Sequence, residues 1–314
     1  MNIQYSRQGR ALAFPLLLGC CLLWGSWPVL SAMVNRWSTD PRYAHGYFVP
    51  AFAVALLWMR RARVQGVNPR PTAWGLAAIG LGAGFQLVGG YYRLGWIEGL
   101  ALLPYISGIC LLTGGLRYLA WAWPSIGFLA FMVPLPWRAE NFLGPPLQLL
   151  ATTASTYALQ TLGLMAFAEG NVIQLNEGRI GVVEACSGLS MLITFVALST
   201  ATALVVKRPL LDRIVLVASS IPVAFAANVA RIVITGALHE MVGGDAATTF
   251  YHDLAGWVMI PLALVLYWFE IAILSRILIE TKHEAFSALD LIGLRRVASP
   301  APAATKAYRQ PSVL

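Results

Sequence analysis

The chain has 314 residues, of which 58% are hydrophobic and only 11% are charged, and its formal net charge is +8. Soluble domains carry roughly a quarter of their residues as charged side chains, so this composition excludes an ordinary soluble protein. Its long apolar runs instead predict an all-α polytopic membrane protein. The positive charge does not indicate nucleic-acid binding, because the basic residues lie in small clusters between apolar runs, as in the cytoplasmic loops of membrane proteins.

Eight apolar segments follow one another along the chain, and each predicts one transmembrane helix. They are 11–33, 44–59, 72–92, 99–116, 118–133, 187–206, 213–237 and 254–275, of which the second and the fifth are short. The first run is too long for the apolar part of a signal peptide, so we interpret it as an uncleaved span. We expect residues 1–282 to form one membrane-embedded domain, and residues 283–314, rich in Pro, Ala and Ser, to form a disordered cytoplasmic tail.

The basic clusters fix the predicted orientation. They precede the first span and follow the second, fourth, sixth and eighth spans. All of them lie on one side if both termini are cytoplasmic, as the positive-inside rule requires. The loops expected on the outer side are 34–43, 93–98, 134–186 and 238–253.

The longest outer loop is predicted to have structure of its own. Residues 141–165 form a helical run that we expect to lie along the membrane interface. Two short runs, 172–175 and 179–183, are separated by Asn176–Glu177–Gly178 and predict a small β-hairpin. This hairpin leads the chain to Cys186 at the start of the sixth span.

Three residues from three predicted helices reach the same depth at the outer face. Cys186 precedes the sixth span, and His252 begins the eighth from outside. Arg231 lies 18 residues beyond Arg213, which places it about 27 Å from the inner end of the seventh span at ~1.5 Å per residue. Asn228 lies one turn before Arg231, which indicates a polar cluster rather than a lone interfacial charge.

These residue types suit acyl transfer through a thiol. A thiolate attacks a carbonyl carbon readily, and a helix N-terminus such as that beside Cys186 favours the anion. His252 can exchange a proton near neutral pH, and Arg231 can stabilise an oxyanion. The other cysteines lie inside apolar runs, where we expect them only to pack, and no spacing indicates a disulfide framework or a zinc site. They are Cys20, Cys21 and Cys110.

Several motifs resemble the exosortase/archaeosortase family over roughly residues 40–275. They are VVEACSGLSML at 182–192, IPVAFAANVARI at 221–232, His252 with Gly256 after it, Tyr43–Ala44–His45–Gly46, and PLPW at 134–137. The cysteine block together with the Asn-x-x-Arg block makes the resemblance specific. One departure is Ser190, where many members carry a basic residue.

The resemblance implies catalytic roles for Cys186 as nucleophile, Arg231 as oxyanion stabiliser and His252 as general acid and base. It also implies supporting roles, without a metal or other cofactor, for Asn228, Glu184, Ser187, Gly188 and His45. The implied substrates are exported proteins that end in a short Pro-Glu-Pro-like motif, a transmembrane helix and a basic cluster, the PEP-CTERM type of sorting signal. The implied enzyme is a cysteine peptidase or transpeptidase of the bacterial inner membrane, with its active site facing the periplasm.

Two other classes remain open from the sequence. Pro-containing helices and an intramembrane arginine also occur in transporters, so a transporter or an export subunit without peptidase activity is one alternative. A metallopeptidase that uses His45, His239, His252 and Glu184 is another. The sequence has no HExxH motif, and His239 has no second histidine four residues on.

Overall fold

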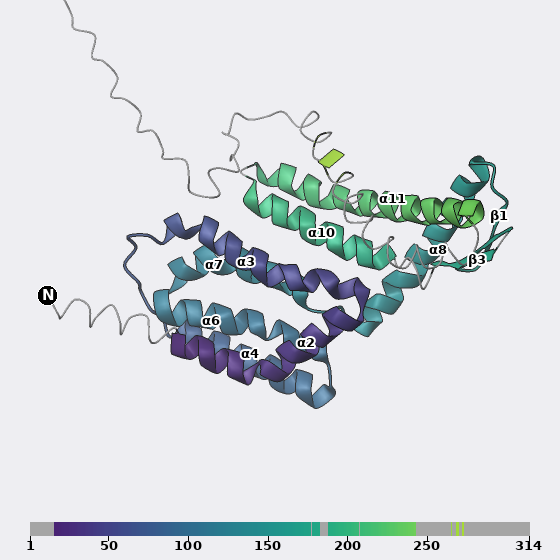
Figure 1. The fold of residues 1–314 in the computed structure, drawn as a ribbon. Coiled ribbons are helices and arrows are strands. Elements are labelled where there is room, and N and C mark those ends of the chain that lie inside the picture. Colours follow the sequence, from purple (N-terminus) through teal and green to yellow (C-terminus); the bar gives the residue numbers. More distant parts are fainter. Residues whose placement is uncertain are drawn as a thin grey trace, which may run out of the picture. The chain divides into compact units, whose positions relative to one another are not determined.

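The computed structural model describes residues 16–176, 178–182, 188–206 and 208–242, together with residues 265, 268, 269 and 272. All of them belong to one unit of the chain, residues 1–281. This unit is mostly helical, with one small sheet (Figure 1). Only the last four residues belong to the predicted eighth span, and the predicted tail 283–314 lies outside the described residues.

The described elements confirm a polytopic helical protein with a small β-insertion. The helices are Leu16–Gly25, α2 (Trp27–Thr39), η1 (Pro41–Tyr47), α3 (Phe48–Met59), η2 (Arg61–Arg63), α4 (Trp74–Tyr92), α5 (Gly95–Leu100), α6 (Leu102–Gly114), α7 (Leu116–Phe128), η3 (Leu129–Met132), α8 (Trp137–Thr161), α10 (Gly188–Val205) and α11 (Leu210–Val242). The strands are β1 (Ala166–Glu169), β2 (Val172–Leu175) and β3 (Gly178–Gly181).

Within the described ranges, three helical stretches are long and apolar enough to cross a membrane, and up to five if each of two bent helix pairs is one span. The unbent stretches are Gly95–Gly114, Gly188–Val205 and Leu210–Met241. Together they support a multi-pass membrane protein. The total of eight spans stays a prediction.

The first predicted span differs from the structure because it is broken. The helix Leu16–Gly25 and α2 meet at an angle of 64°. Pro28 lies in the first turn of α2, where its missing N–H does no harm, whereas inside one continuous helix it would remove a hydrogen bond and clash with the preceding turn. Helix α2 then continues to Thr39, past the predicted end of the span at residue 33.

The β-insertion contains the predicted hairpin and one strand more. Strands β2 and β3 pair antiparallel, with Leu175 opposite Gly178 and Val172 opposite Gly181. Strand β1 pairs with the other edge of β2, and Gly170 in the turn between them has a positive φ of +61°, which glycine adopts without strain. The sequence analysis missed β1 because Ala166–Glu169 contains no β-branched residue.

Glycines allow α4 and α6 to pack closely. The buried residues of α4 are Gly75, Gly82 and Gly89, which recur every seven residues along one face. A Cβ atom on Gly75 would lie 2.7 Å from the backbone oxygen of Gly108, and one on Gly82 would lie 2.7 Å from the Tyr105 ring. Small residues at such contacts are how membrane helices approach each other closely.

Helices α10 and α11 lie side by side and are joined by a short connection, so they run antiparallel (Figure 1). Helix α11 is the longer, and α8 packs against both helices. The C-terminal part of α11 extends past the start of α10, and there Gly236 lies against Leu159 of α8 and Ile180 of β3. The short sheet is thereby packed against the C-terminal part of α11.

We expect Gly75→Ala to lower the thermal stability of the purified protein by several degrees. The added methyl group would meet the Leu112 side chain and the backbone oxygen of Gly108, which cannot move aside as a side chain can, and overpacking of this kind costs about 1–3 kcal/mol. The matched control is Gly80→Ala in the same helix, where an added Cβ meets nothing within 4 Å. Melting in detergent, followed by tryptophan fluorescence, measures both; equal melting temperatures would contradict the close α4–α6 contact.

Candidate functional site

A polar pair in the apolar middle of α11, Asn228 and Arg231, lies beside the start of α10. Asn228 is fully buried, and its Oδ1 accepts a hydrogen bond from Arg231 Nη2 at 3.3 Å. A Cβ atom added to Gly188 would lie 3.2 Å from Asn228 Nδ2. The structure therefore brings together three residues that the sequence analysis singled out, on two different helices.

Two donors at this point have no hydrogen-bond partner among the described residues. They are Asn228 Nδ2 and Arg231 Nε, and both atoms are buried. Buried polar groups in proteins are normally hydrogen-bonded, and exceptions call for an explanation. Donors left open next to a helix N-terminus, where backbone N–H groups also lack intrahelical partners, form an environment suited to an anionic oxygen or sulfur.

Helix α11 supplies this arrangement through its spacing and its small residues. Asn228 and Arg231 are three residues apart, so their side chains are neighbours on one helix face. Ala224 and Ala227, buried on the same helix, contribute to an apolar cluster with Met191 and Phe195 of α10. Helix α11 is one continuous helix from Leu210 to Val242. The predicted distance of about 27 Å along the helix axis between Arg213 and Arg231 therefore applies.

Four predicted site residues lie outside the described part of the chain. They are Cys186, Glu184, Ser187 and His252. The meeting of the cysteine, the arginine and the histidine at one depth is therefore still a prediction. Of the trio, the structure describes Arg231 and its surroundings.

His45 lies in η1, and its Nε2 is 3.2 Å from the backbone oxygen of Phe131. A carbonyl oxygen only accepts, so this hydrogen bond requires the proton on Nε2. The adjacent Gly46 has a packing role, because a side chain there would collide with the indole of Trp37. That indole in turn donates to the Met132 oxygen at 3.0 Å. The Tyr43–Gly46 motif thus fixes η1 against α2 and η3.

A cluster of five charged and polar residues joins α2, η1 and α8. Arg42 lies 2.7 Å from an Asp40 oxygen and 3.2 Å from a Glu140 oxygen. Arg36 reaches the same two carboxylates, at 3.2 Å and 3.8 Å. The Tyr43 hydroxyl donates to Glu140 and accepts from the Leu135 N–H at 3.2 Å. Two guanidinium groups thus balance two carboxylates that are largely removed from solvent.

The cluster shifts the ionisation of its members. Burial alone would raise the pKa of the Asp40 carboxyl, but hydrogen bonds from Arg42 and the charges of Arg42 and Arg36 outweigh it, so this pKa lies below its ordinary value. Burial, with the hydrogen bond to Glu140 and its negative charge, raises the pKa of Tyr43. Tyr43 therefore stays a neutral donor to Glu140.

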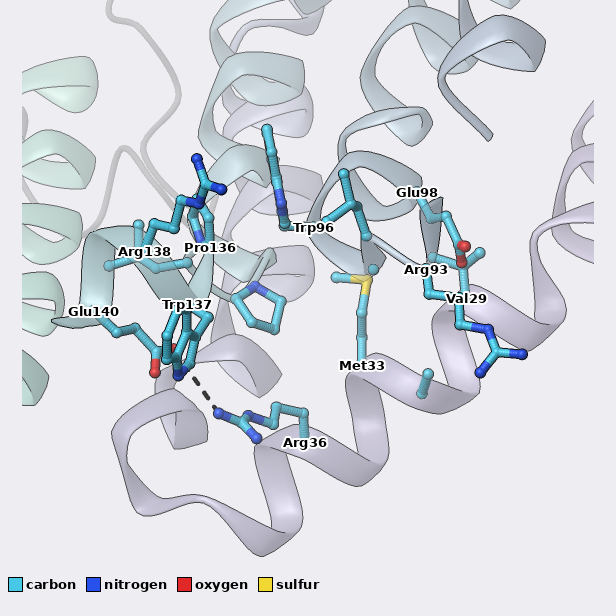
Figure 2. A pocket seen from close by; sticks show the side chains of 15 residues that line it. Val29, Met33, Arg36, Arg93, Trp96, Glu98, Pro136, Trp137, Arg138 and Glu140 are labelled. Atoms are coloured by element: carbon cyan, nitrogen blue, oxygen red, sulfur yellow. Dashed lines mark ion pairs between the residues drawn. The ribbon is translucent and has the colours of Figure 1, made fainter. Parts of the chain in front are cut away.

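A cavity of about 780 Å³ adjoins this cluster (Figure 2). The cavity is lined by residues of α2, of the segment 93–98 and of the segment 134–140. Each of the three lies in or next to a loop that the sequence analysis predicted on the outer side. Met33, Trp96 and Trp137 contribute apolar surface, whereas Arg36, Arg93, Arg138, Glu98 and Glu140 contribute charge. Figure 2 shows Arg36 paired with Glu140, and Arg93 and Arg138 on opposite sides of the cavity.

The sequence analysis did not single out Asp40 and Glu140. A signal was available, because the whole chain has only 14 acidic residues and these two fall in predicted outer loops that also contain Arg36 and Arg42. The ion pairs of Asp40 are local, with Arg36 and Arg42, whereas the pair of Arg42 with Glu140 joins residues 98 apart, a contact that spacing along the chain cannot reveal.

The part of the chain that the structure describes contains no group of three His, Cys, Asp or Glu residues that could hold a metal ion. His239, one ligand of the metallopeptidase alternative, lies with its ring against Gly178 of β3. Two other ligands of that alternative, His252 and Glu184, lie outside the described residues.

A comparison with protein families gives a match over most of the chain. A family model described as transmembrane exosortase matches residues 37–269. The matched region contains the Tyr43–Gly46 motif, the cysteine block, the Asn-x-x-Arg segment and His252. No curated protein and no solved structure matches the chain.

We expect Asp40→Asn to lower the melting temperature at neutral pH, because the neutral amide loses the charge attraction of two arginines. A carboxyl whose pKa is lowered in the folded state stabilises that state above its ordinary pKa, here 3.8, and this stabilisation disappears as the pH falls through the folded value. The difference in melting temperature between wild type and variant should therefore be largest near neutral pH and shrink below about pH 4. A difference that stays constant down to acid pH would contradict the ionic role of Asp40.

Proposed function

The chain belongs to the transmembrane exosortase family, and we propose that it is a cysteine peptidase or transpeptidase that cleaves the C-terminal sorting signals of exported proteins. Membership of the family makes it a multi-pass membrane protein involved in sorting-signal processing. The finer proposal rests most on one observation. The buried, open donors of Asn228 and Arg231 lie beside Gly188, two residues after Cys186 in the sequence.

Chain connectivity supports Cys186 as the nucleophile. Two residues of extended chain span at most about 7 Å, so the thiol is tethered close to the start of α10. A helix N-terminus and a nearby guanidinium both stabilise a thiolate relative to a thiol. Arg231 and the first turn of α10 would supply both effects to this cysteine.

The proposed reaction has two steps. The thiolate of Cys186 attacks the carbonyl carbon of the scissile peptide bond, and Arg231 donates hydrogen bonds to the resulting oxyanion. The intermediate collapses to a thioester as the C–N bond breaks, and the leaving amine takes a proton from His252. Water or another nucleophile then attacks the thioester, giving its proton to His252, and the Cys186 thiolate leaves.

We assign the outer cavity to the extramembrane part of the sorting signal. Arg93 and Arg138 are exposed at this cavity and form no ion pair with a described residue, so they are available to an acidic side chain of the substrate. Trp96 and Trp137 offer flat apolar surface to the prolines of a Pro-Glu-Pro-like motif. Helix α8 begins at this cavity and packs further along against α10 and α11, so one element connects the two regions.

We also propose that both termini are cytoplasmic and that the active site faces the periplasm of a bacterial inner membrane. The support is the distribution of basic loops together with the composition of the cavity. Segments near residues 36, 93–98 and 134–140 lie far apart in sequence, yet they meet at one place. Their meeting agrees with the charge pattern that assigns the corresponding loops to one side.

We expect Cys186→Ala to abolish processing of a substrate with a C-terminal sorting signal while leaving a folded protein. Cys186→Ser should also be severely impaired, because a hydroxyl without a strong base is a far poorer nucleophile than a thiolate. The matched control replaces Cys20, Cys21 and Cys110 by alanine together. Cys20 and Cys21 are exposed and Cys110 is half-buried, and none of them lies in the proposed site.

The measurement is the electrophoretic mobility of a tagged substrate that is coexpressed with each variant at matched membrane levels. Normal cleavage by Cys186→Ala would remove the thiol mechanism. It would leave the metallopeptidase as the remaining catalytic alternative. Absence of cleavage by every form of the protein, wild type included, would favour a transporter or export subunit.

We expect Arg138→Gln to raise the KM for an acidic signal about two- to five-fold with little change in kcat, since one exposed ion pair contributes at most about 1 kcal/mol. Arg117→Gln, at the start of α7 and in a predicted cytoplasmic loop, is the matched control. A charge exchange sharpens the test: Arg138→Glu should recover affinity for a substrate whose motif carries Lys in place of Glu. Equal KM values for Arg138→Gln and Arg117→Gln would contradict the assignment of the cavity.

A further inference from the structure

Asn228 has two ends with different surroundings. Its Oδ1 accepts from Arg231 Nη2 at 3.3 Å, whereas its Nδ2 has no hydrogen-bond partner in the described part of the chain. The side chain has no exposed surface in the resting protein. A fully buried amide that uses only its oxygen is an uncommon arrangement, because amide donors are normally paired when they are buried.

The orientation of this amide follows from chemistry. A guanidinium has only N–H donors and no acceptor, so the group that faces Arg231 must be the amide oxygen. The NH₂ group must therefore face the opposite way, toward Gly188 at the start of α10, where a Cβ atom would lie 3.2 Å from it. Arg231 thus holds Asn228 with its free donor directed at the helix start.

The start of α10 adds donors of its own. The first N–H groups of a helix have no intrahelical acceptor, and α10 is 18 residues long, so the positive end of its dipole is well developed. Gly188 presents no side chain between these N–H groups and the amide. The free amide donor of Asn228 therefore lies beside a helix end, and Arg231 Nε is a further open donor one helical turn along α11.

We propose that Asn228 is a further catalytic residue, whose Nδ2 donates to the oxyanion of the tetrahedral intermediate while its Oδ1 orients the Arg231 guanidinium. This inference rests on the proposed thiol reaction and extends it from one oxyanion donor to two. As the electron pair of the scissile carbonyl moves onto oxygen, Nδ2 gains the acceptor that it lacks in the resting protein. A donor that is satisfied only by the intermediate lowers the barrier, since it contributes nothing to the ground state.

Asn228→Asp is the sharpest variant, because it keeps the shape of the side chain and an oxygen toward Arg231 but replaces the free donor by an acceptor. We expect kcat to fall at least about 100-fold, as when one oxyanion donor is removed, with KM for the substrate changed by less than about three-fold. Ser220→Ala is the matched control on α11. Ser220 is fully buried and bonds only the Val217 oxygen of its own helix, so its loss should leave kcat unchanged.

A second readout does not depend on turnover. In a protein whose other cysteines are alanine, the rate of Cys186 alkylation by iodoacetamide as a function of pH reports the titration of the thiol. The added negative charge in Asn228→Asp should shift this profile to higher pH, whereas the profile of Ser220→Ala should match wild type. If Asn228→Asp does not fold, Asn228→Ser and Asn228→Ala replace it. Serine keeps one donor and should retain more kcat per folded molecule than alanine.

A kcat within three-fold of wild type for Asn228→Asp, or equal values for the serine and alanine variants, would overturn the inference. So would an unchanged alkylation profile in Asn228→Asp. The Cys186→Ala variant distinguishes failure of the Asn228 inference from failure of the proposed function. If Cys186→Ala is inactive while the Asn228 variants keep their kcat, the thiol reaction stands and Asn228 serves only to pack α10 against α11.

Discussion

The constraint on which the rest of the structure depends is the placement of a half-buried guanidinium, that of Arg231, in an apolar helix. A charged side chain within a membrane helix costs free energy unless it is paired or faces a wet cavity. Among the described residues Arg231 has one hydrogen-bond partner, the amide oxygen of Asn228, and its buried Nε has none. Open buried donors are suited to an anionic group, and for this reason the proposed function places the oxyanion beside them.

The packing around Arg231 follows from that constraint. Small residues on α11 and Gly188 on α10 bring the two helices close enough for the Asn228 amide to reach the helix start. Strand β3 and helix α8 contact the C-terminal part of α11 at Gly236. These contacts determine where the chain enters the segment that contains Cys186, because β3 ends five residues before it.

A second group of charges joins three other elements of the fold. Two arginines and two carboxylates join α2, η1 and α8 with their charges balanced, so burying them does not leave an isolated charge. Arg93 and Arg138, at the adjoining cavity, form no ion pair with a described residue. This region thus combines a charge-balanced cluster, which holds the three elements together, with two exposed arginines beside it.

Hydrophobic runs predict α4, α10 and α11 closely, and turn residues predict the β2–β3 hairpin, because these elements depend on local sequence. The Asn228–Arg231 pair was also predictable, since a spacing of three residues places two side chains on one helix face. The break at Ser26 is a local effect of Pro28 that a hydropathy average conceals.

Three features depend on segments far apart in the chain, which no periodicity in the sequence encodes. They are the pairing of strand β1, the contact of Gly188 with Asn228, and the cavity. The position of Cys186 and His252 relative to Arg231 stays a prediction, since both lie outside the described residues.

The central claim is that cleavage proceeds through a thioester, and hydroxylamine tests it directly. The purified protein in detergent is incubated with a peptide substrate at rising hydroxylamine concentrations, and the products are identified by mass. If a thioester forms, hydroxylamine competes with the natural acceptor, and the upstream product ends increasingly in a hydroxamate. Products that end only in a free carboxylate at every concentration, while cleavage continues at its normal rate, would contradict a thioester intermediate.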